Sequence, residues 1–108
     1  MLSLTREEAL RLHRQMWSDM KEALGDCPSF TDRYYFKEGW CLEHTPECIP
    51  ENNCYLCQYI SEVGDSCSSC PIDWGAGPHG CNCVGSRVDY RYSPISEILA
   101  LPERKEAP

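Results

Sequence analysis

The chain has 108 residues with a formal net charge of −7, a hydrophobic share of 42% and nine cysteines. This length predicts one domain with a small core, which a bound metal ion could stabilise strongly. No stretch is long and apolar enough to span a bilayer, and residues 1–8 lack the apolar region of a secretion signal. We therefore expect a cytosolic protein with reduced thiols, because an odd cysteine count disfavours the alternative of a fully paired disulfide framework.

An amphipathic helix is predicted first, within residues 1–25. Thr5 and Glu8 have the spacing of a capping box, and Gly25 is a natural stop. Its apolar stripe comprises Ala9, Leu10, Leu12, His13, Met16, Trp17, Met20, Ala23 and Leu24. We expect this stripe to pack on the cysteine-rich half of the chain, with His13 as a packed or edge residue rather than a ligand.

Residues 26–53 are predicted to contain a short second helix and a loop. The helix would begin after Ser29 or Thr31, run from Phe30 to Glu38 and stop at Gly39. Its expected apolar residues are Phe30 and Tyr34, with Tyr35 or Phe36. The remainder, up to Asn53, is rich in proline and asparagine and reads as a loop.

The strongest chemical signal is a pair of CxxC motifs, Cys54/Cys57 and Cys67/Cys70. Zinc binds thiolates tetrahedrally, and two residues between paired cysteines let one tight turn direct both sulfurs at the same ion. These four residues are therefore the predicted ligands of one Zn²⁺.

Further cysteines and histidines leave alternatives open. Cys81 or Cys83 could replace Cys67 in the main site. A second zinc could be built from two groups of reserve ligands, which are Cys41, His44 and Cys48 in one, and His79, Cys81 and Cys83 in the other. Against this, Cys27, Cys41 and Cys48 could simply be small buried hydrophobic residues.

The zinc-binding segment is assigned to residues 54–85, with a helical turn or two beginning inside the first CxxC. In residues 86–102, an extended piece at 87–92 should precede a last helix with Ser93 as N-cap and Pro94 in its first position. The apolar side of this helix comprises Ile95, Ile98, Leu99 and Leu101. Residues 103–108 are expected to form a loose tail.

These predictions add up to a single domain spanning residues 1–108. Its predicted fold class is a small α-rich, metal-stabilised domain, with the N-terminal amphipathic helix and the short C-terminal helix packed on an irregular zinc-knuckle core.

The charge pattern bears on the kind of partner. Between Lys37 and Arg87 there is no lysine or arginine, yet the interval holds seven acidic residues. Zinc modules that bind nucleic acid surround their knuckles with cations, so nucleic acid is not expected to bind through the zinc segment. The alternative is nucleic-acid contact through basic residues of the first helix, Arg6, Arg11, Arg14 and Lys21.

Catalysis has little support in the sequence. Four cysteines make a closed structural zinc site, and no catalytic triad, phosphate-binding glycine motif or HExxH is present. A redox role for either CxxC is disfavoured, because neither shows the basic or helix-N-terminal surroundings that lower a thiol pKa. We expect no enzyme activity.

Three segments together resemble a family of small, largely uncharacterised zinc-binding proteins encoded by phages and prophages of Firmicutes. They are residues 8–17, residues 53–59 followed by Cys70-Pro71-Ile72-Asp73-Trp74, and residues 98–104. The resemblance supports Cys54, Cys57 and Cys70 as ligands and implies a cytoplasmic accessory protein that binds a host protein. Such a protein would inhibit a defence system or modulate transcription in the bacterial host cell.

The sequence therefore favours a non-enzymatic, zinc-stabilised acidic module that binds a host protein, whose target would present a basic surface. The alternative function is a zinc-containing nucleic-acid-binding regulator that uses the first helix.

Overall fold

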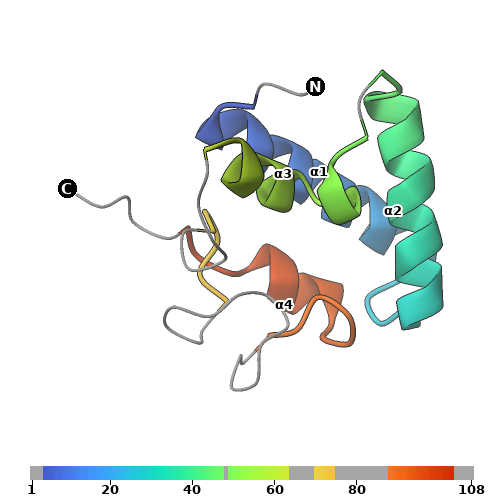
Figure 1. Ribbon diagram of the computed structural model, residues 1–108. Coiled ribbons are helices and arrows are strands. Elements are labelled where there is room, and N and C mark those ends of the chain that lie inside the picture. The colour runs from blue at the N-terminus through green and yellow to red at the C-terminus, as the bar shows by residue number, and fades with distance from the viewer. Residues whose placement is uncertain (1–3, 48, 64–69, 75–87, 104–108) are drawn as a thin grey trace.

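The computed structural model describes residues 4–47, 49–63, 70–74 and 88–103. Its elements are α1 (Arg6–Leu24), α2 (Phe30–His44), the 3₁₀ turn η1 (Glu51–Asn53), α3 (Tyr55–Glu62) and α4 (Ile95–Leu99) (Figure 1). The radius of gyration is 13.1 Å, close to the roughly 13 Å expected of a compact chain of this length. The prediction of a small helix-rich fold is confirmed, whereas a zinc-knuckle core is not shown by the described residues.

Helix α1 begins and ends where the sequence predicts. The Thr5 hydroxyl accepts a hydrogen bond from the Glu8 N–H at 3.1 Å, and Gly25 ends the helix with a φ of 86°. Its buried residues are Ala9, Leu10, His13, Met16, Trp17 and Met20. The predicted stripe is wrong at its C-terminal end, because Ala23 and Leu24 are exposed.

Helix α2 is six residues longer than predicted, because Gly39 does not stop it. Ser29 is the N-cap, and its hydroxyl accepts from the Asp32 N–H at 3.1 Å. The helix ends at His44, where Thr45 donates from its N–H and from its hydroxyl to the Cys41 carbonyl. Burial of Trp40 and Cys41 past the glycine outweighs the roughly 1 kcal/mol that glycine costs in a helix.

The predicted apolar face of α2 is also wrong. Phe30, Tyr34 and Tyr35 are exposed and Phe36 is only half-buried. The buried residues are instead Arg33, Lys37, Trp40 and Cys41. These four follow the helical spacing of a core-facing stripe, although two of them are cations.

The C-terminal region differs from the prediction in three places. Residues 88–93 form a turn rather than an extended segment, closed by the Ser93 N–H on the Asp89 carbonyl at 2.9 Å. Ser93 does not cap α4, because its hydroxyl accepts from the Asp89 N–H and the helix starts one residue later than expected, at Ile95. Glu103 is held by α1 rather than lying in a loose tail.

The cap of α4 comes from a distant part of the chain. The Asp26 carboxylate accepts from the Ser96 N–H at 2.7 Å and from the Ser96 hydroxyl at 2.9 Å, and the Asp26 carbonyl accepts from the Ile95 N–H. These hydrogen bonds lower the pKa of Asp26, first through the Ser96 backbone N–H. The loop after α1 is thereby tied to the start of α4.

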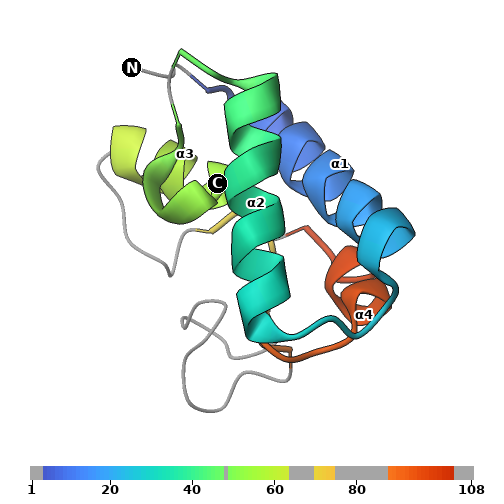
Figure 2. The ribbon, with the colours of Figure 1, turned by 90° about the vertical axis from the view of Figure 1, so that its right-hand side faces the viewer.

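Helix α1 is the element on which the others pack. It contacts α2, α3 and α4, and in Figure 2 α3 and α4 lie on either side of α2. The largest fully buried core side chains include Trp17, Tyr55, Met16, Met20, Leu56, Ile72, Ile95 and Ile98. Of the predicted apolar side of the last helix, Ile95, Ile98 and Leu101 are buried as expected, whereas Leu99 is only half-buried.

Candidate functional site

The first CxxC motif forms one turn at the start of α3. Cys54 is the N-cap residue, and its sulfur accepts a hydrogen bond from the Cys57 N–H at 3.2 Å. Both cysteines are half-buried. A thiol in this position faces the partial positive charge of a helix N-terminus, which favours the thiolate that a metal ion requires.

The environment of Cys54 corrects one interpretation made from the sequence. Hydrogen bonding from Cys57, first through its side chain, lowers the pKa of the Cys54 thiol to about 6, with the charge of Lys37 acting in the same direction against burial. The helix N-terminus is local to the motif, whereas the basic group, Lys37, is brought to Cys54 by the fold. The argument that used their absence against thiol chemistry was wrong, and a low thiol pKa also suits zinc binding.

The remaining predicted zinc ligands are only partly described. Cys70 is buried, and segment 70–74 lies beside α3 in Figures 1 and 2. Cys67, Cys48, His79, Cys81 and Cys83 lie outside the described residues. Within the described ranges no three histidine, cysteine or acidic side chains are grouped so that they could hold a metal ion. The donor chemistry of Cys54 and Cys57 fits zinc, whereas a complete ligand set stays a prediction.

The reserve ligands on α2 have other contacts. Cys41 is fully buried, and burial raises the pKa of its thiol. The His44 ring stacks on Trp40 at 3.7 Å between centroids, with Nδ1 3.0 Å from the Trp40 carbonyl oxygen. Cys41 thus behaves as the small buried residue of the alternative interpretation, but Cys27 does not, because it is exposed.

A cavity of about 320 Å³ adjoins the first CxxC. It is lined by Cys54 and Cys57, by residues of α1 and α2, and by aromatic rings of Trp74 and Tyr90. The sequence did not predict this cavity, because its walls come from five separate parts of the chain. It is the place where the described thiols, buried cations and aromatic rings meet.

Two cations of α2 line this cavity. The Arg33 side chain donates from Nε to the Pro28 carbonyl and from Nη1 to the Tyr90 carbonyl, each at 3.0 Å. Lys37 places its ammonium 4.9 Å from the ring centroid of Tyr90 and 5.7 Å from that of Trp17. Arg33 is therefore hydrogen-bonded, whereas the described contacts of the Lys37 ammonium are with aromatic faces.

His13, on α1, also lines the cavity. It is buried and makes edge contacts with Trp17 and Trp74, at 6.4 and 6.2 Å between ring centroids. Burial lowers its pKa to about 3, and the charges of Lys37 and Arg14 act in the same direction. The expectation that His13 is a packed residue is confirmed, and its ring is neutral at ordinary pH.

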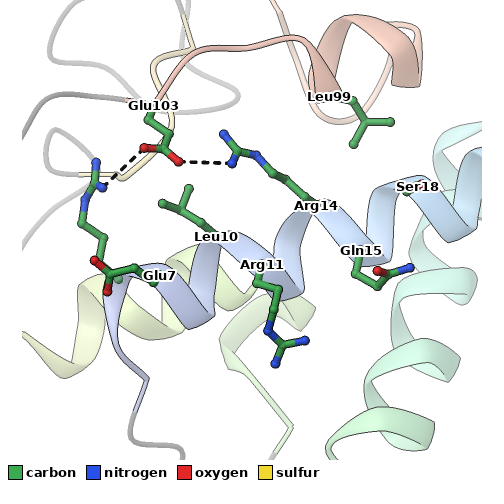
Figure 3. Close-up of a pocket in the computed structure, with 9 residues that line it drawn as sticks. Glu7, Leu10, Arg11, Arg14, Gln15, Ser18, Leu99 and Glu103 are labelled. Carbon is green, nitrogen blue, oxygen red and sulfur yellow. Dashed lines mark hydrogen bonds and ion pairs between the residues drawn. The ribbon is translucent and has the colours of Figure 1, made fainter.

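A second hollow, of about 630 Å³, lies between α1 and the end of the α4 segment (Figure 3). There Glu103 accepts from Arg14 at 3.1 Å and pairs with Arg6 at 3.8 Å. Arg11 lines the same hollow but points away from Glu103 in Figure 3. The arginines of α1 are thus partly neutralised by a carboxylate, which weakens the case for a phosphate-binding surface here.

The outward face of α2 forms a third surface, which we call the acid–aromatic face. It comprises Asp32, Tyr34, Tyr35, Leu42 and Glu43, all exposed. Tyr34 and Tyr35 pack edge to face with 5.5 Å between ring centroids, and beside them Phe30 contacts Tyr92 at 6.2 Å. The two basic residues of α2 are buried, so this face carries carboxylates without lysine or arginine of its own helix.

Comparison of the chain with protein families, with curated proteins and with solved structures found no match. The resemblance to the phage family therefore stays a prediction. In the part of the chain that the structure describes, no helix has both the length and the apolar character needed to cross a membrane.

Proposed function

We propose that this protein is a non-enzymatic, zinc-stabilised acidic interaction module that binds a basic protein surface through the acid–aromatic face of α2. In this proposal zinc is held by Cys54, Cys57 and Cys70, with Cys67 as the fourth ligand. The metal has a structural role, and the face of α2 makes the contact with the partner in the bacterial cytoplasm.

The observation that carries the proposal is the separation of charge across α2. Arg33 is 1% exposed and Lys37 is 7% exposed, whereas Tyr34 and Tyr35 are 50% and 66% exposed. Asp32, near the start of the helix, and Glu43, near its end, are exposed as well. Large aromatic side chains are seldom gathered on a surface without a partner, and tyrosine is among the residues enriched at interaction hot spots.

The chemistry of this face defines the partner. Carboxylates attract lysine and arginine over a distance of about 8–10 Å at physiological salt, and tyrosine rings bind the same cations by cation–π contact. An acidic nucleic acid would be repelled by the carboxylates, since no cation of α2 is exposed to offset them. The favoured partner is therefore a protein with a lysine- or arginine-rich patch, and the resemblance makes a host protein the expected source.

The experiment is affinity capture from bacterial lysate by the wild-type protein and by the double variant Tyr35→Ala/Leu42→Ala, whose two residues are exposed and do not line the cavity. A captured protein supports the proposal only if the double variant loses it, if the control Arg11→Ala retains it, and if salt weakens the complex. Each variant is first checked for an unchanged helical circular-dichroism spectrum. A partner that the double variant binds as well as the wild type would contradict the proposed face.

The alternative is nucleic-acid binding through α1. It predicts a gel shift at low salt that the variant Arg11→Glu/Arg14→Glu abolishes while keeping its fold. Salt-sensitive DNA or RNA binding by the pure protein, without capture of any protein partner, would replace our proposal with this alternative. No shift at low salt would remove the alternative.

A further inference from the structure

The cavity between α1, α2 and α3 has a composition that the interaction module does not use. Aromatic rings form much of its lining, namely Trp17, Phe30, Tyr34, Trp74 and Tyr90. Lys37 also lines it and carries the ammonium that stands over the Trp17 and Tyr90 rings. The pocket is therefore largely aromatic with cationic groups in its wall, which is typical of small-molecule sites.

Lys37 is more than nine-tenths buried and forms no ion pair with a described carboxylate, although its charge acts on the Cys54 thiol. The ion pairs of the described residues join other groups, Arg6 and Arg14 with Glu103 and Arg91 with Asp89. The described contacts of its ammonium are the two aromatic faces. A buried charge without an opposite charge is unfavourable, and cation–π contact offsets only part of that cost. An anion bound in the cavity would therefore be stabilised by this ammonium.

Trp74 gives a second, independent indication. It is 2% exposed, and its Nε1–H has no hydrogen-bond partner among the described residues. A buried indole N–H normally finds an acceptor, so an unpaired one beside a cavity marks the place of a missing acceptor atom. Trp74 and Lys37 line the same cavity, and both are hydrogen-bond donors.

We propose that this cavity binds a small aromatic carboxylate, whose oxygens accept hydrogen bonds from Lys37 Nζ and Trp74 Nε1 and whose ring stacks among the aromatic walls. About 150 Å³ is enough to hold benzene, so about 320 Å³ accommodates one ring with a carboxylate and further substituents. The neutral ring of His13 adds no positive charge to the cavity.

The thiols in the same cavity offer a different counter-anion. Lys37 acts electrostatically on Cys54, and a zinc-bound thiolate would carry negative charge near the ammonium. In that arrangement Lys37 would support the metal, and no ligand would be needed. The experiment therefore has to separate ligand binding from metal retention.

The test uses the full-length protein with its zinc content measured, titrated with 4-hydroxybenzoate as the probe. Binding is followed by tryptophan fluorescence and by the ¹H–¹⁵N resonance of the Trp74 indole. We expect saturable binding and a downfield shift of that resonance as the N–H gains an acceptor. The neutral analogue 4-hydroxybenzyl alcohol should bind at least roughly tenfold more weakly, since the charge-assisted hydrogen bond is lost.

Three variants locate the site. Lys37→Met, which keeps the length of the side chain without its charge, should weaken binding by roughly tenfold or more, and Lys37→Arg should recover part of the affinity. Lys21→Met removes a lysine from the exposed part of α1 and should leave binding unchanged. If Lys37→Met fails to fold, Trp74→Phe takes its place and should weaken binding severalfold.

The proposal is overturned if 4-hydroxybenzoate does not bind saturably, or if the alcohol binds equally well. It is also overturned if Lys37→Met releases zinc while the wild type shows no binding of the probe, which would assign the ammonium to the metal centre. Inorganic phosphate serves as a second anion. Binding of phosphate equal to that of 4-hydroxybenzoate would overturn the role of the aromatic walls.

Discussion

The two faces of α2 differ from those of an ordinary surface helix, because the cations are buried and the tyrosines are exposed. The inward face holds Arg33 and Lys37 among Trp40 and Cys41, whereas the outward face holds tyrosines beside carboxylates. On most surface helices the cations would lie outside and the aromatic rings inside. The comparison teaches that helical spacing identifies the buried stripe, while the residue types on it depend on which partners the rest of the fold supplies.

Burial of the two inward cations is tolerated because other segments provide carbonyl oxygens and aromatic faces that contact them. Carbonyl oxygens of Pro28 and Tyr90 accept the Arg33 guanidinium, and the rings of Trp17 and Tyr90 face the Lys37 ammonium. Of the outward tyrosines, Tyr35 packs on Tyr34, and Tyr34 also lines the cavity. The inward face therefore serves the fold and the cavity, and the outward face is available to a partner, with Tyr34 at the border because it also lines the cavity.

The largest expected effect is at the cysteine turn that borders the inward face. Cys54→Ser should abolish zinc binding, because it removes one thiolate ligand, while the serine hydroxyl keeps the N-cap of α3. The wild type should contain about one zinc per chain by elemental analysis, and zinc binding contributes on the order of 10 kcal/mol to folding in small zinc modules. The variant should therefore unfold or lose its metal.

Cys27→Ser is the matched control, since Cys27 is an exposed thiol outside both CxxC motifs. The zinc site would be refuted if both the wild type and Cys54→Ser were folded and free of metal.

The next effect compares one aromatic residue from each face. Trp40→Ala should lower the free energy of unfolding by about 3–5 kcal/mol, because it leaves a cavity in the core and removes the 2.8 Å hydrogen bond from Trp40 Nε1 to Asp19. Tyr35→Ala should change it by less than about 0.5 kcal/mol, since Tyr35 is exposed. Urea unfolding measures both, and equal losses would mean that the outward face is also part of the core.

A smaller effect is expected from the comparison of a buried arginine, Arg33, with an exposed one, Arg11. Arg33→Met should lower the free energy of unfolding by about 2 kcal/mol, because the carbonyls of Pro28 and Tyr90 lose a charged donor. Arg11→Met, on the exposed side of α1, should cost less than about 0.5 kcal/mol. A stability of Arg33→Met within error of the wild type would show that methionine packs there as well as the hydrogen-bonded cation does.

The smallest effect is a pH dependence from His13. Its pKa is lowered from 6.5 to about 3 in the folded protein, so between these values the unfolded chain binds the extra proton. Stability should therefore fall as pH decreases below about 6.5, with a contribution of up to about 1.4 kcal/mol per pH unit from this residue. His13→Gln should reduce the slope of unfolding free energy against pH by that amount.

Direct titration by NMR provides the second measurement. The imidazole resonances of His13 should keep the positions of the neutral ring at pH 5. A midpoint near 6.5 would contradict the burial described for this residue.

The local features of the fold were largely predictable. Thr5, Gly25 and Ser29 are caps that act through their own neighbours in the chain, and the stripe from Ala9 to Met20 follows from spacing alone. The start of α3 inside the first CxxC was also expected. Such features depend on contacts within a few residues, which the sequence displays directly.

The errors share one cause, which is contact between distant segments. Gly39 predicts the end of a helix, but α2 continues past it, where Trp40 donates a hydrogen bond to Asp19 of α1. Ser93 reads as a cap, but Asp26 takes that role from the other half of the chain. Glu103 was expected in a loose tail, but it forms ion pairs with Arg6 and Arg14 of α1. Propensity differences of about 1 kcal/mol are smaller than these tertiary contributions.

By itself, the sequence determined the helical character and the caps of the first two helices, because each depends on residues adjacent in the chain. Tertiary structure alone decided which way α2 faces, and so where Lys37, Trp74 and the first CxxC meet. The physical reason is that burial of a cation requires acceptors and aromatic faces from other segments. No local pattern within α2 could indicate that Pro28, Trp17 and Tyr90 would provide them.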